Sequence, residues 1–289
     1  MLFVTAFVCL HAGCQSWPWH SGPVPESVAN CRALSQQALT SIESGRYQEA
    51  EGLLDRAVES CPIDPEARRH YAEVLLKRNA VDSALVHLEE AIRLTPHDTS
   101  LVVRAGEIYL SAGRTAEAER HAGRAINLDG HSADAWALRG RVRLAQGRRR
   151  EALADLQQAI GYRPEDPWLL REVAALYMAL NRPGRALLYL QTLADTHVAG
   201  EEPLDLIERQ GQAYLALGRF RDAANCYRTA CLREPLAVEM HYRLAEAELQ
   251  AGRVDQAHAA ITAALQLQPN HAASRQLVAR LADHARVTD

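Results

Sequence analysis

An alanine recurs at a fixed spacing along most of this chain. Successive members of the series lie 34 residues apart, except for one step of 37 between Ala186 and Ala223. The series consists of Ala50, Ala84, Ala118, Ala152, Ala186, Ala223 and Ala257. A fixed period between about 20 and 50 residues is typical of a stacked array in which each unit packs against its neighbours. The period therefore predicts a repeat protein rather than one globular core.

The period divides the chain into seven units that run from Cys31 to His271, with three extra residues near Glu201, Glu202 and Pro203. The predicted units are 31–64, 65–98, 99–132, 133–166, 167–203, 204–237 and 238–271. Ala, Leu, Arg, Glu and Gln dominate the chain, and these residues favour helix. Aromatic residues make up only 6% of the sequence, so an all-α fold is expected rather than a sheet.

Three positions of each unit are reserved for small residues or for a helix-ending residue. The eighth position is Ala38, Ala72, Gly106, Gly140, Ala174, Gly211 or Ala245, and the twenty-seventh is alanine in every unit except at Leu193. Proline occupies the thirty-second position in most units, and Trp136 occupies the fourth position of its unit. In these features the units resemble tetratricopeptide repeats. The resemblance covers residues 31–271 and implies an all-α solenoid, a superhelix of about seven stacked antiparallel helix pairs.

The fifth unit departs from this pattern. It has Asn181 where five other units have a glycine that can end the first helix in the left-handed conformation, and Val198 where most units have proline. We expect a longer second helix or a loop over residues 196–203. After the repeats, residues 272–289 are predicted to form a capping helix whose Leu277, Val278 and Leu281 cover the exposed end of the stack.

The N-terminal residues differ from the repeats. Leu2 to Leu10 are apolar throughout, and the segment that follows ends in a small-residue stretch and Cys14. This resembles a bacterial lipoprotein signal over residues 1–14, with Cys14 as the lipid anchor and residues 15–30 as a tether. The pattern is incomplete, because His11 stands where leucine is usual and no Lys or Arg precedes the apolar stretch. The alternative is a helix that belongs to the fold.

Functional motifs are absent from the sequence. It contains no phosphate-binding loop, dinucleotide fingerprint, zinc-protease motif or nucleophile elbow, and no catalytic domain remains once the repeats are subtracted. The net charge of −4 is not that of a nucleic-acid binder or of a protein that binds anionic membranes. We therefore interpret the chain as a binding scaffold without enzymatic activity, cofactor or metal site.

The family resemblance implies that a partner binds to the first helices of successive units, mainly at positions two, five, nine, twelve and thirteen. We call this surface the first-helix face. Its candidate residues are Arg69, Glu73, Lys77, Glu107, Asp134, Arg141, Trp168, Arg171, Asp205, Glu208, Gln212, Glu239, Tyr242 and Glu246. At these positions the last two units carry carboxylates and no Lys or Arg, which favours a basic or mixed-charge protein or peptide with Trp168 and Tyr242 as apolar contacts. The alternative is that these side chains form a solvated surface.

Two cysteines are candidates for a disulfide. Cys31 opens the first helix of the first unit and Cys61 closes the second, and these two ends meet in an antiparallel pair. An oxidising envelope would permit a bridge, and two free thiols are the alternative.

The main hypothesis is an adaptor that is lipid-anchored in a bacterial cell envelope or secreted into it. It would hold a protein or peptide in the concave groove lined by the first-helix face. An alternative is an accessory subunit that organises an envelope enzyme complex, for example in glycan or cell-wall assembly. A cytoplasmic adaptor is a third reading if the N-terminal stretch is not a leader. Oligomeric state and partner identity do not follow from the sequence.

Overall fold

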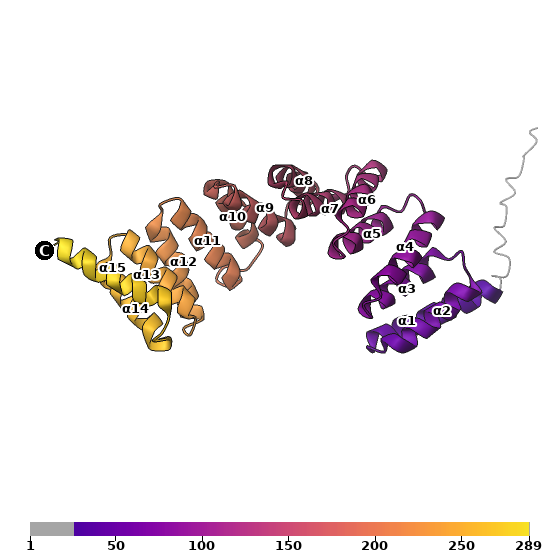
Figure 1. Cartoon of the computed structure of the whole chain (residues 1–289), viewed down its shortest axis with the longest axis horizontal. Coiled ribbons are helices and arrows are strands. Elements are labelled where there is room, and N and C mark those ends of the chain that lie inside the picture. Colours follow the sequence, from indigo (N-terminus) through magenta and orange to yellow (C-terminus); the bar gives the residue numbers. More distant parts are fainter. Residues whose placement is uncertain (1–25, 289) are drawn as a thin grey trace, which may run out of the picture. The chain divides into compact units, whose positions relative to one another are not determined.

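The computed structural model describes residues 26–288, and side chains up to residue 281. Residues 1–25, which include the proposed leader, Cys14 and most of the tether, lie outside the described residues. The described part forms helices and contains no strand, so the predicted all-α fold is confirmed. The helices fall into two compact units, one that ends at Pro96 and one that begins at His97 (Figure 1). From here on, the first unit and the second unit are these two parts of the chain, and each of the seven predicted helix pairs is called a repeat.

Consecutive helices pack in pairs within each unit. The first unit holds α1 (Glu26–Glu43), α2 (Tyr47–Ser60), α3 (Pro65–Lys77) and α4 (Val81–Leu94). The second unit holds α5 (Thr99–Ser111), α6 (Thr115–Leu128), α7 (Ala133–Ala145), α8 (Arg149–Tyr162), α9 (Pro167–Ala179), α10 (Pro183–Asp195), α11 (Leu204–Ala216), α12 (Phe220–Arg233), α13 (Val238–Gln250), α14 (Val254–Leu267) and α15 (Ala272–Thr288). The odd-numbered helices from α1 to α13 are the first helices of the repeats.

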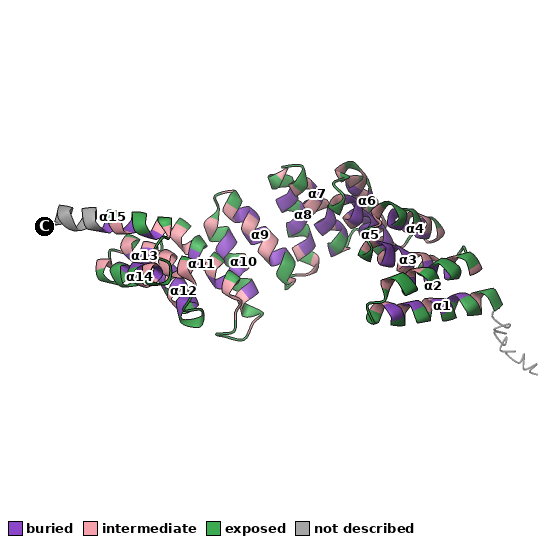
Figure 2. Cartoon of the chain, turned by 60° about the horizontal axis from the view of Figure 1, so that its bottom comes forward, coloured by how far each residue is buried: buried purple, intermediate pink, exposed green. Residues whose placement is uncertain are grey.

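Small residues lie where paired helices approach each other most closely. Ala50, Ala57 and Ala72 are all completely buried. At Gly211 there is no room even for a methyl group, because a Cβ there would lie 2.7 Å from Cζ of Tyr227. Buried residues therefore follow the facing sides of the helices (Figure 2).

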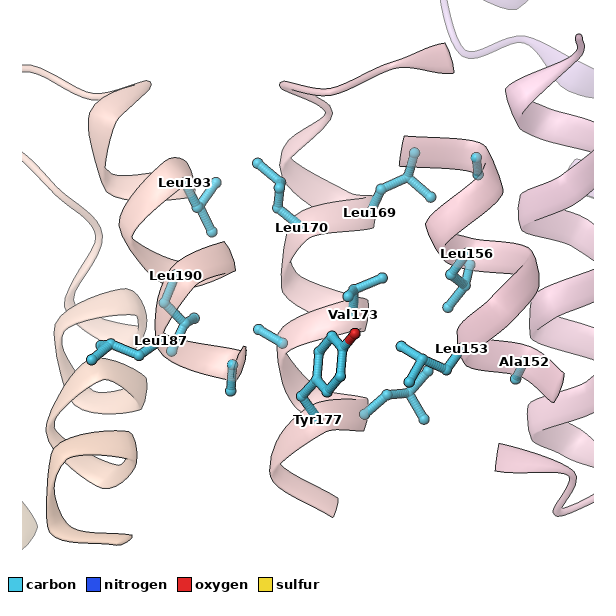
Figure 3. Packing of buried hydrophobic residues seen from close by; sticks show 14 of the residues in the cluster. Ala152, Leu153, Leu156, Leu169, Leu170, Val173, Tyr177, Leu187, Leu190 and Leu193 are labelled. Carbon is cyan, nitrogen blue, oxygen red and sulfur yellow. The ribbon is translucent and has the colours of Figure 1, made fainter. Parts of the chain in front are cut away.

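Larger apolar side chains fill the space between the helices of the second unit. Leu190 and Leu193 of α10 lie between that helix and α9, where Leu170 faces them (Figure 3). On the other side of α9, the Tyr177 hydroxyl accepts a hydrogen bond of 2.7 Å from Nε2 of Gln157 on α8. Neighbouring helix pairs within the second unit thus share their cores, as stacked repeats require.

The turn inside each pair has the backbone conformation that the sequence indicates. Gly45 and four equivalent glycines have positive φ angles between 69° and 76°. Asn181 and Asn79 occupy the same position and have φ angles of 55° and 61°. Asparagine tolerates this left-handed conformation better than most residues, so it replaces glycine without changing the turn.

The structure decides between the two expectations for the fifth repeat. The second helix of that repeat, α10, ends at Asp195, so the extra residues form a loop over 196–203 rather than a longer helix. The guanidinium of Arg233 on α12 donates a 2.6 Å hydrogen bond to the carbonyl oxygen of Glu202 and holds this loop against the next pair.

Both ends of the repeat array show how the chain terminates a stack. Helix α1 begins at Glu26, so the tether predicted to reach residue 30 extends too far. Residues 26–30 continue the helix, and the Asn30 side chain reaches Ser60 on α2 at 3.3 Å. At the other end, Leu277 and Leu281 of α15 are buried against the apolar cluster of α13 and α14.

The candidate disulfide is not formed. Cys31 and Cys61 are both free cysteines. The Cys31 thiol instead donates a hydrogen bond of 3.3 Å to Oδ2 of Asp64. Burial, together with this carboxylate, raises the pKa of Cys31 to about 11.

Thiol alkylation can check this arrangement. At pH 8, iodoacetamide is expected to modify half-buried Cys61 well before Cys31, because alkylation requires an accessible thiolate. Peptide mapping of the native protein after timed alkylation measures the order. Equal protection of Cys31 and Cys61, relieved only by a reductant, would instead indicate a bridge.

Candidate functional site

The predicted residues of the first unit lie on α3. Arg69 forms an ion pair with Glu66 at 2.6 Å, one turn earlier on the same helix. Glu73 is partly buried and Lys77 is exposed near the end of the helix. These three residues share one helix, and within the described residues the ion pair of Arg69 joins it to Glu66 of the same helix.

In the second unit, predicted residues from three successive first helices meet. Nη1 of Arg141 on α7 lies 3.2 Å from Oε1 of Glu107 on α5. The same guanidinium lies 5.7 Å from the centre of the Trp168 ring on α9, a distance at which a cation is attracted to the ring. Arg141 therefore links α5, α7 and α9 along the first-helix face.

A second set of contacts joins α9 to α11. Nη1 of Arg171 on α9 lies 3.8 Å from Oδ2 of Asp205 on α11. Arg209, one turn after Asp205, approaches the same oxygen at 3.9 Å. On the next turn of α11, Gln212 donates a 3.0 Å hydrogen bond to Oε1 of Glu208. The row of predicted residues thus continues from α9 to α11.

The last part of the row is centred on α13. Arg243 forms ion pairs with Glu239 at 2.8 Å and with Glu246 at 3.4 Å. Burial works against the charged form of Arg243, but these two carboxylates outweigh burial and raise its pKa. Tyr242 packs edge-on against His271, with their ring centres 5.8 Å apart.

These ion pairs change the predicted charge of the surface. The sequence prediction counted carboxylates at the expected contact positions and found no cation among them. Arg209 and Arg243 each lie at the sixth position of a repeat, which is not one of the expected contact positions. They nevertheless pair with Asp205, Glu239 and Glu246. The first helices of the last two repeats therefore carry Arg209 and Arg243 beside the carboxylates of Asp205, Glu208, Glu239 and Glu246, so their charge is mixed and less acidic than the expected contact positions alone indicate.

Asp134 does not join the row. Its carboxylate pairs with Arg163, which lies in the turn that connects α8 to α9, and the Asp134 side chain is 64% exposed. Its place at the second position of α7 brings it near the turn rather than near the neighbouring first helices.

A cavity opens between α9, α10 and α11. It has a volume of about 220 Å³ and is lined by Ala174, Ala175, Met178, Leu190, Arg209 and Gln212. We call it the α9–α11 cavity. The sequence prediction named Gln212 but missed Ala175 and Met178, although these two occupy the ninth and twelfth positions of their repeat, which are expected contact positions. The signal was present in the position, and it was overlooked because these side chains carry no charge or aromatic ring.

Small side chains explain why this space stays open. On the α9 side, Ala174 and Ala175 contribute only methyl groups to the wall. On the α11 side, the polar ends of Arg209 and Gln212 are drawn to Asp205 and Glu208. These contacts hold the two longer side chains to residues of their own helix, so they line the cavity without filling it.

The described residues provide neither a cluster of metal ligands nor a membrane-spanning helix. No group of three or more His, Cys, Asp and Glu residues there is arranged to hold a metal ion. Among the helices of residues 26–288, none combines the length and apolar character needed to cross a bilayer.

Sequence comparison matches nearly all of the repeat region to tetratricopeptide models. One tetratricopeptide repeat model matches residues 36–99 and 208–283, and another matches residues 75–142 and 143–206. No curated protein sequence matches the chain.

Several solved structures share the fold. The protein YrrB, described as a tetratricopeptide protein with an unusual peptide-binding site, is 18% identical with a TM-score of 0.59, over 65% of this chain and 96% of its own. PilW, a type IV pilus biogenesis factor, is 20% identical with a TM-score of 0.60, over 71% of this chain and 94% of its own. PilF of Pseudomonas aeruginosa is 17% identical with a TM-score of 0.62, over 76% of this chain and 99% of its own.

Members of this family are typically non-catalytic scaffolds for protein interaction, and a stack of helix pairs that presents one row of first helices suits that role. The two models together account for the repeats from residue 36 to residue 283, with only residue 207 left unmatched between them. The helix pairs, the buried alanines and the left-handed turns of the structure agree with them. The chain belongs to the tetratricopeptide repeat family.

Proposed function

We propose that the first-helix face of the second unit, from α9 to α13, binds an extended segment of a protein partner. The observation that carries this proposal is the meeting of side chains from separate repeats in one row beside a cavity. Contacts such as Arg171 with Asp205 show that successive first helices present their polar groups to a common surface. A segment lying along that row would contact several repeats at once.

The charge of the row favours a mixed-charge segment. Arg171, Arg209 and Arg243 already balance Asp205, Glu239 and Glu246, whereas Glu208 receives only the amide hydrogen bond of Gln212. A basic group on the partner would pair with Glu208, and an acidic group could pair with Arg209 or Arg243. Complementary charges of this kind set the register and the association rate more than the total affinity.

A charge reversal tests the proposal. Replacing Glu208, Glu239 and Glu246 with lysine is expected to weaken peptide binding about tenfold or more, because three partly exposed pairing sites each worth up to about 1 kcal/mol would become repulsive. Binding of array peptides to the wild type and to the variant, followed by fluorescence titration of the best peptides, measures the change.

A matched control separates this effect from total charge. Lysine substitutions at Asp195, Glu201 and Glu234 make the same charge change at exposed carboxylates on the loops and helix ends, away from the first helices. These substitutions are expected to leave affinity within about twofold, as unpaired surface charges contribute little. Equal losses in the two variants, or unchanged binding in both, would contradict binding at the first-helix face.

A second candidate is an accessory subunit that organises an enzyme complex of the cell envelope. It shares an envelope location with the adaptor, because the apolar stretch from Leu2 to Leu10 followed by Cys14 would anchor either protein by lipid in the envelope. Affinity purification from detergent extracts distinguishes the candidates. A stoichiometric enzyme supports the accessory subunit, whereas a short tail or peptide segment supports the adaptor. Mass spectrometry of the purified protein tests the anchor, since an unprocessed Met1 would rule it out.

A further inference from the structure

The α9–α11 cavity differs from the rest of the first-helix face in chemistry. Most contacts along the face are ion pairs between exposed side chains. The cavity instead is lined by the apolar side chains of Leu190, Ala174, Ala175 and Met178, together with the two polar side chains of Arg209 and Gln212. Leu190 belongs to a second helix and is 1% exposed, so the cavity reaches the core between α9 and α10.

The size of the cavity limits what can fill it. A volume of about 220 Å³ is below the roughly 300 to 1,000 Å³ of sites for drug-sized ligands and cofactors. It is several times the roughly 30 Å³ that one water molecule occupies in the liquid, and a stable buried water needs two to four polar partners. Among the lining residues only Arg209 and Gln212 offer polar side-chain groups to water, whereas Ala174, Ala175, Met178 and Leu190 offer none. One aliphatic side chain suits both the volume and the walls.

Arg209 and Gln212 would hold the main chain of the bound segment on either side of the side chain that enters the cavity. Arg209 and Gln212 have more N–H donors than their bonds to Asp205 and Glu208 use. Both are therefore able to donate to carbonyl oxygens of an extended segment while its side chain points inward. Met178 adds a flexible wall that adapts to the shape of what enters.

We infer that the α9–α11 cavity is the anchor subsite for one unbranched or γ-branched aliphatic side chain, leucine or methionine, of a bound protein segment. This inference rests on the proposed function and specifies which side chain the partner must present. Residues buried in central pockets and surrounded by weaker contacts carry a large share of the affinity of an interface. The charged row would then select the register, and the cavity would supply most of the binding strength.

The test begins with a peptide library selected against the full chain. Selected peptides are expected to share one position occupied by leucine or methionine. Filling the cavity by Ala175→Leu is expected to weaken those peptides by about tenfold to a hundredfold, in the range of an interface hot spot. The matched control is Ala154→Leu, which adds the same side chain at an exposed position of the second helix α8 and is expected to change affinity less than twofold.

A second variant changes the preference rather than the strength of binding. Met178→Ala enlarges the cavity, so selection against this variant is expected to favour phenylalanine or tryptophan at the shared position. Thermal unfolding of all three variants checks that they fold. A repeated selection that still returns leucine or methionine for Met178→Ala, together with unchanged affinity for Ala175→Leu, would overturn the anchor.

Methionine NMR gives a direct readout of occupancy. The chain has only three methionines, Met1, Met178 and Met240, so methyl-labelled protein gives few signals. A bound peptide is expected to shift the Met178 methyl signal, and replacing the shared residue with alanine should abolish that shift. A Met178 shift produced by n-hexanol that the selected peptides do not reverse would identify a small-molecule site and contradict the inference.

The outcomes separate this inference from the proposed function. Peptides that bind, and that weaken with the Glu208, Glu239 and Glu246 reversal but not with Ala175→Leu, leave the first-helix face as the binding surface and overturn the anchor. If no peptide binds, or if charge reversal has no effect, the proposed function fails and the anchor fails with it.

Discussion

Replacing Asp155 with asparagine is expected to lower the free energy of unfolding by about 3 kcal/mol, because it removes one partner of a buried ion cluster. Asp155 on α8 is 2% exposed. Arg139 on α7 donates to it from Nε at 3.0 Å and from Nη2 at 2.8 Å, and Nη1 of Arg143 approaches Oδ2 at 2.7 Å. Both arginines come from the other helix of the same pair.

The size of this effect follows from what asparagine cannot do. Its amide nitrogen is a donor and would face arginine N–H groups that are donors too, and it has no charge to balance two guanidinium groups. The two arginine side chains are 24% and 18% exposed, so water compensates them in part and places the loss at the lower end of the range for buried pairs.

Urea unfolding monitored by circular dichroism measures the change. Asp134→Asn is the matched control, because Asp134 also pairs with an arginine but its side chain is 64% exposed. That variant is expected to lose less than about 1 kcal/mol. Similar losses for the two variants would show that burial does not decide the contribution of these ion pairs.

The second large effect is a difference in sign between two substitutions of glycine by alanine. Gly211→Ala on α11 is expected to destabilise the protein by about 1 to 3 kcal/mol, as overpacking in a core does. The added Cβ would lie 2.7 to 3.1 Å from three atoms of the Tyr227 ring. Tyr227 on α12 is completely buried and its ring is rigid, so α11 and α12 must move apart.

Gly123→Ala is the control with the opposite expectation. Gly123 lies inside α6, and a Cβ there would have no atom within 4 Å. Alanine should stabilise the helix by roughly 0.5 to 1 kcal/mol, since it removes the conformational freedom of glycine in the unfolded chain. Thermal unfolding of both variants measures the two shifts. A rise in stability for Gly211→Ala would contradict the close helix approach at this position.

The sequence was enough to predict the helix pairs because their constraints are local or periodic. Alanine and glycine at fixed positions reflect close helix approaches, and the left-handed turn at Asn181 follows from the position it shares with glycines. The loop at residues 196–203 was one of two expectations, because three extra residues can lengthen a helix or a loop. The end of α10 at Asp195 shows that the chain adopts the loop, and Arg233 binds that loop at Glu202.

The binding surface was harder to predict because its properties depend on contacts between repeats. The pairs of Arg243 with Glu239 and Glu246 follow the i,i+4 and i,i+3 spacing of one helix, so the sequence predicts them once the sixth position of the repeat is considered. The contact of Arg171 with Asp205 joins two repeats and has no such local spacing. The α9–α11 cavity likewise depends on how far Arg209 and Gln212 of one repeat extend toward the helices of another.

The central claim is that partners bind to the first helices of the second unit. Photo-crosslinking tests it most directly, with benzoylphenylalanine placed at Gln212 on α11 or at Gln191, an exposed residue of the second helix α10. A peptide selected against the full chain is expected to form adducts from position 212 and not from position 191, and unlabelled peptide should suppress them. Adducts that form mainly from position 191 would place the binding surface on the second helices and contradict the account.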